Sequence, residues 1–146
     1  MFDSILVANR GEIALRIMRT AQAMGIQTIA IYVDADKDSP HVRFADKAVL
    51  LPDGGYLEID AVLDAAQKSN AGAIHPGYGF LSENAEFAKR VNKENIIWVG
   101  PSPKVISVMG DKLKAKELAT KANVPTLPMT SDDKEAKKIG YPLLRK

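Results

Sequence analysis

The sequence contains no cysteine, and aromatic residues make up only 6% of its 146 residues. Without cysteine the chain has no disulfide framework and no thiolate metal site, a composition that fits a reducing compartment. No apolar run is long enough to span a membrane, and no signal-peptide pattern precedes the first apolar run. A net charge of +2 is too small to indicate nucleic-acid binding. We therefore expect a cytoplasmic protein, with the mitochondrial matrix left open for a processed form.

Glycine is scarce where a nucleotide-binding fold would need it. Residues 5–25 have the pattern of a strand, a tight turn and an amphipathic helix, but the turn contains a single glycine, Gly11. A dinucleotide-binding turn uses three glycines to bring bare backbone against the pyrophosphate, although Asp34 lies where a ribose-binding acid would. The turn therefore favours a structural role, in which Arg10 either helps to hold an anion or pairs with Glu12.

Short apolar runs alternate with amphipathic segments up to residue 99. The runs are continuously apolar, which is typical of strands buried on both faces. The intervening segments place apolar residues on one stripe of a helix. We expect strands at residues 4–8, 27–33, 47–51, 72–75 and 95–99, helices at 11–24, 41–45, 58–69 and 83–93, and buried stripes of Ile13, Ile17, Ala21 and Met24 and of Ile59, Val62, Leu63 and Ala66.

This alternation predicts an α/β fold with a doubly wound, Rossmann-like parallel sheet. Ligands of such sheets bind outside the carboxyl ends of the strands. The loop "HPGYGFLSEN", residues 75–84, follows one of these strands, and its two glycines bracket Tyr78. The loop could form an interdomain contact or the wall of a site, and we expect Ser82 to cap the next helix. A packed, hydrogen-bonded His75 is favoured over a catalytic base, because the sequence shows no acidic partner for it.

A second loop region follows the last strand, at residues 100–125. Ser102-Pro103 is expected to open a short helix that Gly110 ends, and Asp111 is expected to cap the next helix. Lys112 then lies in a first helical turn, where the macrodipole disfavours a cation by about 0.3–1 kcal/mol. A lysine beside free helix N–H groups can bind phosphate, so the residues alone leave a phosphate-binding lysine and an ordinary surface lysine both open.

Three segments, "ILVANRGEIALRIMRTAQAMGI", "HPGYGFLSEN" and "VGPSPKVISVMGDK", resemble in order and spacing the biotin carboxylase family. The resemblance covers the whole chain. The family comprises the ATP-dependent subunits or domains of acetyl-CoA, propionyl-CoA, methylcrotonyl-CoA, pyruvate and related carboxylases. It implies a Rossmann-like pre-ATP-grasp domain at residues 1–112, followed at residues 113–146 by the truncated beginning of an ATP-grasp domain.

The resemblance also implies site residues. Family members use the lysine of the MGDK motif, here Lys112, and the lysine that closes a "GYPxxxK" strand, here Lys146, as ATP contacts. Arg145 departs from the family, in which an apolar residue is usual at that position. The family's glycine-rich phosphate loop, metal-binding glutamates, bicarbonate site and catalytic base would follow residue 146. The resemblance therefore implies no catalytic residue and no metal ligand in this chain.

The implied activity is that of an ATP-dependent ligase. Bicarbonate attacks the γ-phosphate of ATP, and the resulting carboxyphosphate supplies CO₂ to the ureido nitrogen of biotin on a carrier protein. The implied cofactors are ATP, Mg²⁺ or Mn²⁺, and carrier-bound biotin. The implied partners are a biotin carboxyl carrier domain or protein, a carboxyltransferase component, and a second copy that pairs through biotin carboxylase domains, with the helix bearing Arg16 and Arg19 as a candidate surface.

No nucleic acid or membrane partner is expected. The 146 residues alone are expected to be inactive. A stand-alone Rossmann-like binding or dimerisation module without catalysis is the alternative from a different functional class.

Overall fold

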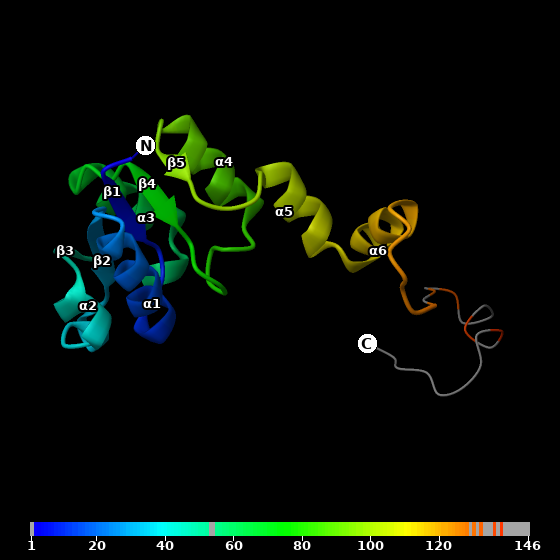
Figure 1. The fold of residues 1–146 in the computed structure, drawn as a ribbon, viewed down its shortest axis with the longest axis horizontal. Coiled ribbons are helices and arrows are strands. Elements are labelled where there is room, and N and C mark those ends of the chain that lie inside the picture. The colour runs from blue at the N-terminus through cyan, green and yellow to red at the C-terminus, as the bar shows by residue number, and fades with distance from the viewer. Residues whose placement is uncertain are drawn as a thin grey trace. The chain divides into compact units, whose positions relative to one another are not determined.

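The computed structural model describes residues 2–52, 55–128, 130, 132, 136 and 138. The chain divides into two compact units, Met1–Gly110 and Asp111–Lys146. The first unit contains a five-stranded parallel sheet in the order β3-β2-β1-β4-β5 (Figure 1). The predicted doubly wound parallel sheet is therefore confirmed. The strands are β1 (Ser4–Val7), β2 (Gln27–Tyr32), β3 (Lys47–Leu50), β4 (Ala73–His75) and β5 (Ile97–Trp98).

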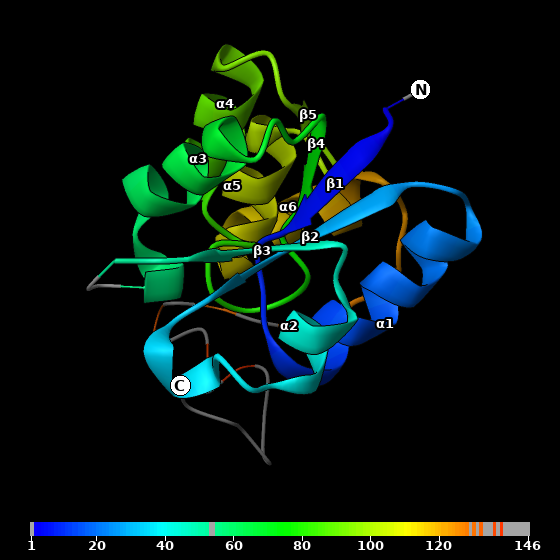
Figure 2. The same ribbon diagram turned by 90° about the vertical axis from the view of Figure 1, so that its left-hand side faces the viewer.

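Helices cover both faces of this sheet. Figure 2 shows α1 (Gly11–Ala23) and α2 (Pro40–Phe44) on one face, and α3 (Ile59–Lys68), α4 (Ala85–Lys93) and α5 (Pro103–Gly110) on the other. Because successive side chains of a strand point to opposite faces, Leu6 packs with α3 and α4 whereas Val7 packs with α1. Burial on both faces explains why β1, β2 and β4 are continuously apolar. The expectation is wrong for the edge strands, since β3 is mostly exposed and Ile97 of β5 is 49% exposed.

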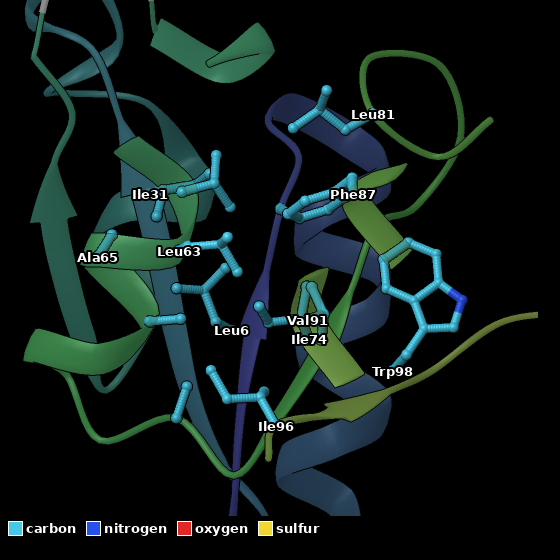
Figure 3. Packing of buried hydrophobic residues seen from close by; sticks show 14 of the residues in the cluster. Leu6, Ile31, Leu63, Ala65, Ile74, Leu81, Phe87, Val91, Ile96 and Trp98 are labelled. Atoms are coloured by element: carbon cyan, nitrogen blue, oxygen red, sulfur yellow. The ribbon is translucent and has the colours of Figure 1, made fainter. Parts of the chain in front are cut away.

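The larger core cluster lies between the sheet and α3 to α5 (Figure 3). Phe87 of α4 is completely buried there, and its ring meets the Trp98 ring edge-on, with 5.4 Å between the ring centroids. Full burial of a side chain of this size contributes about 1.5–3 kcal/mol, and an edge-on aromatic pair adds about 0.5–1.5 kcal/mol. This contact fixes α4, and so the end of the loop that precedes it.

Four helices end on a residue with positive φ, which releases the chain toward the next element. These residues are Gly25, Asn70, Asn95 and Asn123, the types that adopt the left-handed conformation most easily. In each case the next amide donates a hydrogen bond to a carbonyl five residues back, as Ile26 does to Ala21 over 2.9 Å. The expected closure of the first helix at Gly25 is confirmed.

Two sequence-based expectations about the helices are wrong. Asn84, not Ser82, caps α4, because its side-chain oxygen accepts a hydrogen bond from the Phe87 amide over 2.9 Å. The amide of Ser82 instead closes a turn onto the Gly79 carbonyl. Met24 does not belong to the buried stripe of α1: the helix ends one residue earlier, and Met24 is 65% exposed.

The described part of the second unit contains the helix α6 (Lys112–Lys121). Asp111 caps this helix as predicted, since its Oδ1 accepts hydrogen bonds from the amides of Leu113 (3.0 Å) and Lys114 (3.1 Å). No residue of α6 is buried. None of the helices in the described ranges is long and apolar enough to cross a membrane.

Candidate functional site at the carboxyl edge of the sheet

All five strands run in the same direction, so the loops that follow them meet at one edge of the sheet. Asn9 is the centre of this edge, with only 2% of its surface exposed. Its Nδ2 donates hydrogen bonds of 2.8 Å to the carbonyls of Pro76 and Tyr78, and its Oδ1 accepts one from the Arg10 amide. The residue that replaces a glycine of the dinucleotide motif therefore joins the loop after β1 to the loop after β4.

The loop after β4 approaches Asn9 closely enough to require a glycine. Gly77 has a φ of +65°, and a Cβ atom there would lie 2.7 Å from Asn9 Nδ2. The Gly77 amide donates to Nδ1 of His75 over 3.0 Å. Burial, followed by the positive charge of Arg16, lowers the pKa of His75. His75 is therefore the packed, hydrogen-bonded histidine that the sequence favoured.

Arg10 pairs with Asp36 rather than with Glu12. Its Nη1 lies 3.1 Å from Asp36 Oδ1, and the Asp36 side chain is 13% exposed. The hydroxyl of Tyr56 donates to Asp36 Oδ2 over 2.8 Å. Burial and this carboxylate raise the pKa of Tyr56 far above its ordinary value, so the hydroxyl stays a donor. Asp36, which follows the second strand as a ribose-binding acid would, thus interacts with two side chains of its own chain, Arg10 and Tyr56.

The N-terminus of α1 is occupied in the same way. The Gly11 amide, one of the donors that would face a pyrophosphate, donates to Nδ1 of the fully buried His41 over 3.3 Å. Burial lowers the pKa of His41, against smaller opposing effects of the Ile31 carbonyl and the Asp36 carboxylate. A neutral imidazole therefore accepts a hydrogen bond from an amide that would face a phosphate in a dinucleotide-binding turn.

The structure describes one of the two predicted ATP contacts, Lys112. Lys112 is exposed at the first position of α6, as expected, but Asp111 already accepts hydrogen bonds from two amides of that helical turn. A phosphate at this position would therefore meet the Lys112 ammonium rather than those amides. Lys146 and the neighbouring Arg145 lie outside the described residues. The nucleotide-binding role of both lysines stays a prediction. Among the described side chains, no group of three His, Asp or Glu residues could hold a metal ion.

Sequence reasoning missed three residues of this edge: Asp36, His41 and Tyr56. The sequence pointed to Asp34 as the acid after the second strand. In the structure Asp34 is exposed, and Asp36 is the residue that pairs with Arg10. The only signal in the sequence was the acidic cluster that follows the second strand. His41 and Tyr56 lie 30 and 20 positions from their partners, Gly11 and Asp36. No local pattern could have paired them.

The fold and this edge define a class: a doubly wound α/β domain in which the chain's own side chains bond the first turn and the acid after the second strand. The family described as "Biotin carboxylase, N-terminal domain" matches residues 1–106. The chain belongs to this family, as the resemblance of its motifs implied.

Proteins of several organisms show the same relationship. Biotin carboxylase 2 of Bacillus subtilis is 45% identical over 100% of this chain and 36% of its own length. The human mitochondrial propionyl-CoA carboxylase alpha chain is 48% identical over 99% of this chain and 22% of its own length. This chain therefore spans about a third or less of the length of these relatives.

Solved structures agree on the fold. The biotin carboxylase domain of a thermophilic 2-oxoglutarate carboxylase, bound to bicarbonate, is 44% identical, with a TM-score of 0.89 over 99% of this chain and 35% of that chain. The Kluyveromyces lactis urea amidolyase is 51% identical, with a TM-score of 0.84 over 87% of this chain and 8% of that chain.

Proposed function

We propose that this chain forms the N-terminal part of an ATP-dependent biotin carboxylase, a ligase that carboxylates carrier-bound biotin with bicarbonate through carboxyphosphate. The observation that carries the proposal is the match of the entire chain to biotin carboxylase domains in both sequence and fold. We also propose that residues 1–112 are the pre-ATP-grasp domain and that residues 113–146 begin the ATP-grasp domain. The division of the chain into units at Gly110 supports this boundary.

Lys112 and Lys146 would contact ATP. Phosphoryl transfer depends on positioning and on neutralising the charge that spreads over the transferred group, and lysine ammonium groups suit that task. Lys112 is exposed at the start of a helix whose first turn Asp111 stabilises, so its ammonium can reach a phosphate without loss of the cap. Mg²⁺ or Mn²⁺ and biotin would be held mainly by residues that the longer relatives have beyond the matched region.

The partners follow from the same proposal: a biotin carboxyl carrier, a carboxyltransferase component, and a second copy of the biotin carboxylase. Arg16 and Arg19 of α1 are both exposed, but the Arg19 guanidinium lies 6.0 Å from the centroid of the Phe44 ring in its own unit. Light scattering of the protein, with a double Arg16→Ala/Arg19→Ala variant, would test the pairing surface. Cytoplasmic location stays a prediction, since the human relative is described as mitochondrial.

A chimera makes the proposal testable. In this chimera the present chain replaces the matching segment of Bacillus subtilis biotin carboxylase 2, to which it aligns along its whole length. Lys112→Ala in the chimera is expected to weaken MgATP binding by about 1–3 kcal/mol, the scale of a lost charge-assisted hydrogen bond. Lys121→Ala, at the other end of the same helix, is the matched control. Unchanged calorimetric affinity of folded Lys112→Ala would make Lys112 an ordinary surface residue.

The 146 residues alone are proposed to be insufficient for turnover, because they span 36% of the length of the Bacillus relative. With Lys112 and Lys146 as the only proposed ATP contacts, the isolated chain should bind MgATP with a Kd above about 1 mM. Incubation with ATP, Mg²⁺, bicarbonate and free biotin should release no biotin-dependent phosphate above background. Such release would place the catalytic machinery within these residues.

A further inference from the structure

The four loops at the carboxyl edge are joined into a closed cycle of side-chain contacts. Asn9 in the first loop holds the loop after β4 through the carbonyls of Pro76 and Tyr78. From that loop, the Phe80 ring lies against the ring of Tyr56 in the loop after β3, with 5.2 Å between centroids.

The remaining two contacts close the cycle. Tyr56 donates its hydroxyl hydrogen bond to Asp36 in the loop after β2, and Asp36 pairs with Arg10, which is adjacent to Asn9 in the first loop. We call Asn9, Arg10, Asp36, Tyr56 and Phe80 the edge ring. Every loop of the edge ring has a partner on each side, so no loop can shift without breaking a contact of another.

The loop of residues 76–80 is the part of the edge ring that carries strain. Phe80 has a φ of +42°, and it is the only residue other than glycine or asparagine with positive φ in the described part of the chain. A bulky residue keeps such a conformation only where surrounding contacts impose it. Its contact with Tyr56, the Asn9 hydrogen bonds and the turn that the Ser82 amide closes onto the Gly79 carbonyl are such contacts. The loop is therefore held in one shape from both of its ends.

This fixed loop presents a side chain to solvent at the ligand edge. Tyr78 lies between Gly77 and Gly79, both with positive φ, and it is 63% exposed, although its backbone carbonyl is bound by Asn9. Fixing the backbone of a residue costs conformational entropy, and an exposed side chain gains little burial to offset that cost. That cost is useful where a group must already be in place when a partner molecule arrives.

We propose that the edge ring positions the 76–80 loop for the reaction of the complete carboxylase, so that Tyr56 and Asp36 act as positioning residues from the opposite side of the edge. This role rests on the proposed function. The ring itself is a property of the chain alone and can be tested without turnover.

Amide exchange in the 146-residue chain tests the ring. Tyr56→Phe removes only the hydroxyl that bonds Asp36, and Asn9→Ala removes the link to the 76–80 loop. Both variants should exchange the Gly77 and Ser82 amides about three- to tenfold faster, while amides of β1 and β2 keep their rates. Tyr32→Phe is the matched control, because the Tyr32 hydroxyl forms no hydrogen bond with any residue in the described ranges. Unchanged Gly77 and Ser82 rates in Tyr56→Phe, or equal acceleration throughout the sheet, would overturn the ring.

Turnover of the chimera tests the positioning role. Tyr56→Phe should lower kcat about three- to tenfold and leave KM for ATP within about twofold, because the 76–80 loop contains neither of the predicted ATP lysines. The double variant Tyr56→Phe/Asp36→Asn should be no slower than the slower single variant, since Asp36→Asn already weakens the Tyr56 contact together with the Arg10 pair. Unchanged kcat, or a parallel change in KM for ATP, would overturn the role. An unsubstituted chimera without turnover would contradict the proposed function and the role that rests on it, while amide exchange still decides the ring.

Discussion

Helices α1 and α6 differ in what stabilises them: buried side chains in α1, and capping residues at both ends in α6. α1 has no side-chain cap at its N-terminus, but it buries four side chains against the sheet: Ile13, Ala14, Met18 and Ala21. α6 buries none, yet Asp111 caps its start and Asn123 ends it in the left-handed conformation. Packing can therefore specify a helix whose N-terminus lacks a side-chain cap, and local signals can specify one in which no residue is buried.

This contrast separates two sources of stability in the chain. The sheet unit should unfold cooperatively, because the core clusters on its two faces pack against the same strands. α6 is made of strong helix formers, with Leu113 and Leu118 each 51% exposed. Changes in α6 should therefore remain local, whereas changes in the core should affect the whole unit.

The largest effect is expected in the core. Phe87→Ala should lower the free energy of unfolding by about 3–5 kcal/mol, through lost burial and the cavity it leaves beside Trp98. Leu118→Ala on α6 should change it by less than about 0.5 kcal/mol, as exposed sites usually do. Denaturant unfolding followed by Trp98 fluorescence measures both. Similar losses in the two variants would erase the distinction between the helices.

Two glycines of the same loop provide the next test. Gly77→Ala should cost about 2–4 kcal/mol, because alanine meets both the left-handed φ penalty and a clash with Asn9. Gly79→Ala has the same φ penalty, at +66°, but nothing lies within 4 Å of its would-be Cβ, so about 1 kcal/mol is expected. Equal losses of unfolding free energy would show that the Asn9 contact is not tight.

A pH dependence should follow from the two histidines. Burial lowers the pKa of both His41 and His75, so the folded chain binds fewer protons in acid than the unfolded chain. Above the ordinary histidine pKa of about 6.5 both histidines are neutral in the folded and the unfolded chain, so they do not lower the free energy of unfolding. As the pH falls below about 6.5, the unfolded chain binds protons that the folded chain does not, and the free energy of unfolding falls. Thermal unfolding between about pH 7 and about pH 5 should show this loss.

The histidine variants identify its source. His41→Asn/His75→Asn should have a smaller difference in unfolding free energy between those two pH values, whatever its stability at neutral pH. An undiminished difference would assign the loss to carboxylates instead.

The smallest effect concerns the cap of α6. Asp111→Ala should speed amide exchange in the first turn of α6 about fivefold without changing global unfolding. Asp111→Asn keeps a good capping side chain and should stay near the unsubstituted rate. The hydrogen bond that Asp111 accepts from the Lys114 amide lowers the pKa of this carboxyl group. The cap therefore stays negatively charged to a lower pH than an unpaired aspartate would. Equal exchange in both variants would mean that the cap hydrogen bonds contribute nothing.

Local signals in the sequence predicted most of the fold. The strand and helix alternation, the Asp111 cap, and the Ser102-Pro103 start of α5 all depend on near neighbours, and the structure confirms each of them. The preference of serine and asparagine for helix N-termini could not decide whether Ser82 or Asn84 caps α4. The turn that precedes α4 determines which of the two lies at the cap position.

The candidate site was less predictable. The contacts of Asn9 with Pro76 and Tyr78 span 67 and 69 positions. Glu12 was an equally good partner for Arg10 by local rules, and only the folded sheet brings Asp36 to it. The missing glycines argue against a dinucleotide, which stays a prediction, and the contact of the His41 imidazole with the Gly11 amide could be found only in the structure.

Biotin-dependent ATP cleavage by the chimera with Bacillus subtilis biotin carboxylase 2 tests the role of this chain most directly. A folded chimera should release phosphate only when ATP, Mg²⁺, bicarbonate and biotin are all present, and Lys112→Ala should raise its KM for ATP about fivefold or more. A chimera that folds like its parent but shows no biotin-dependent cleavage would contradict the assignment of this chain to biotin carboxylation.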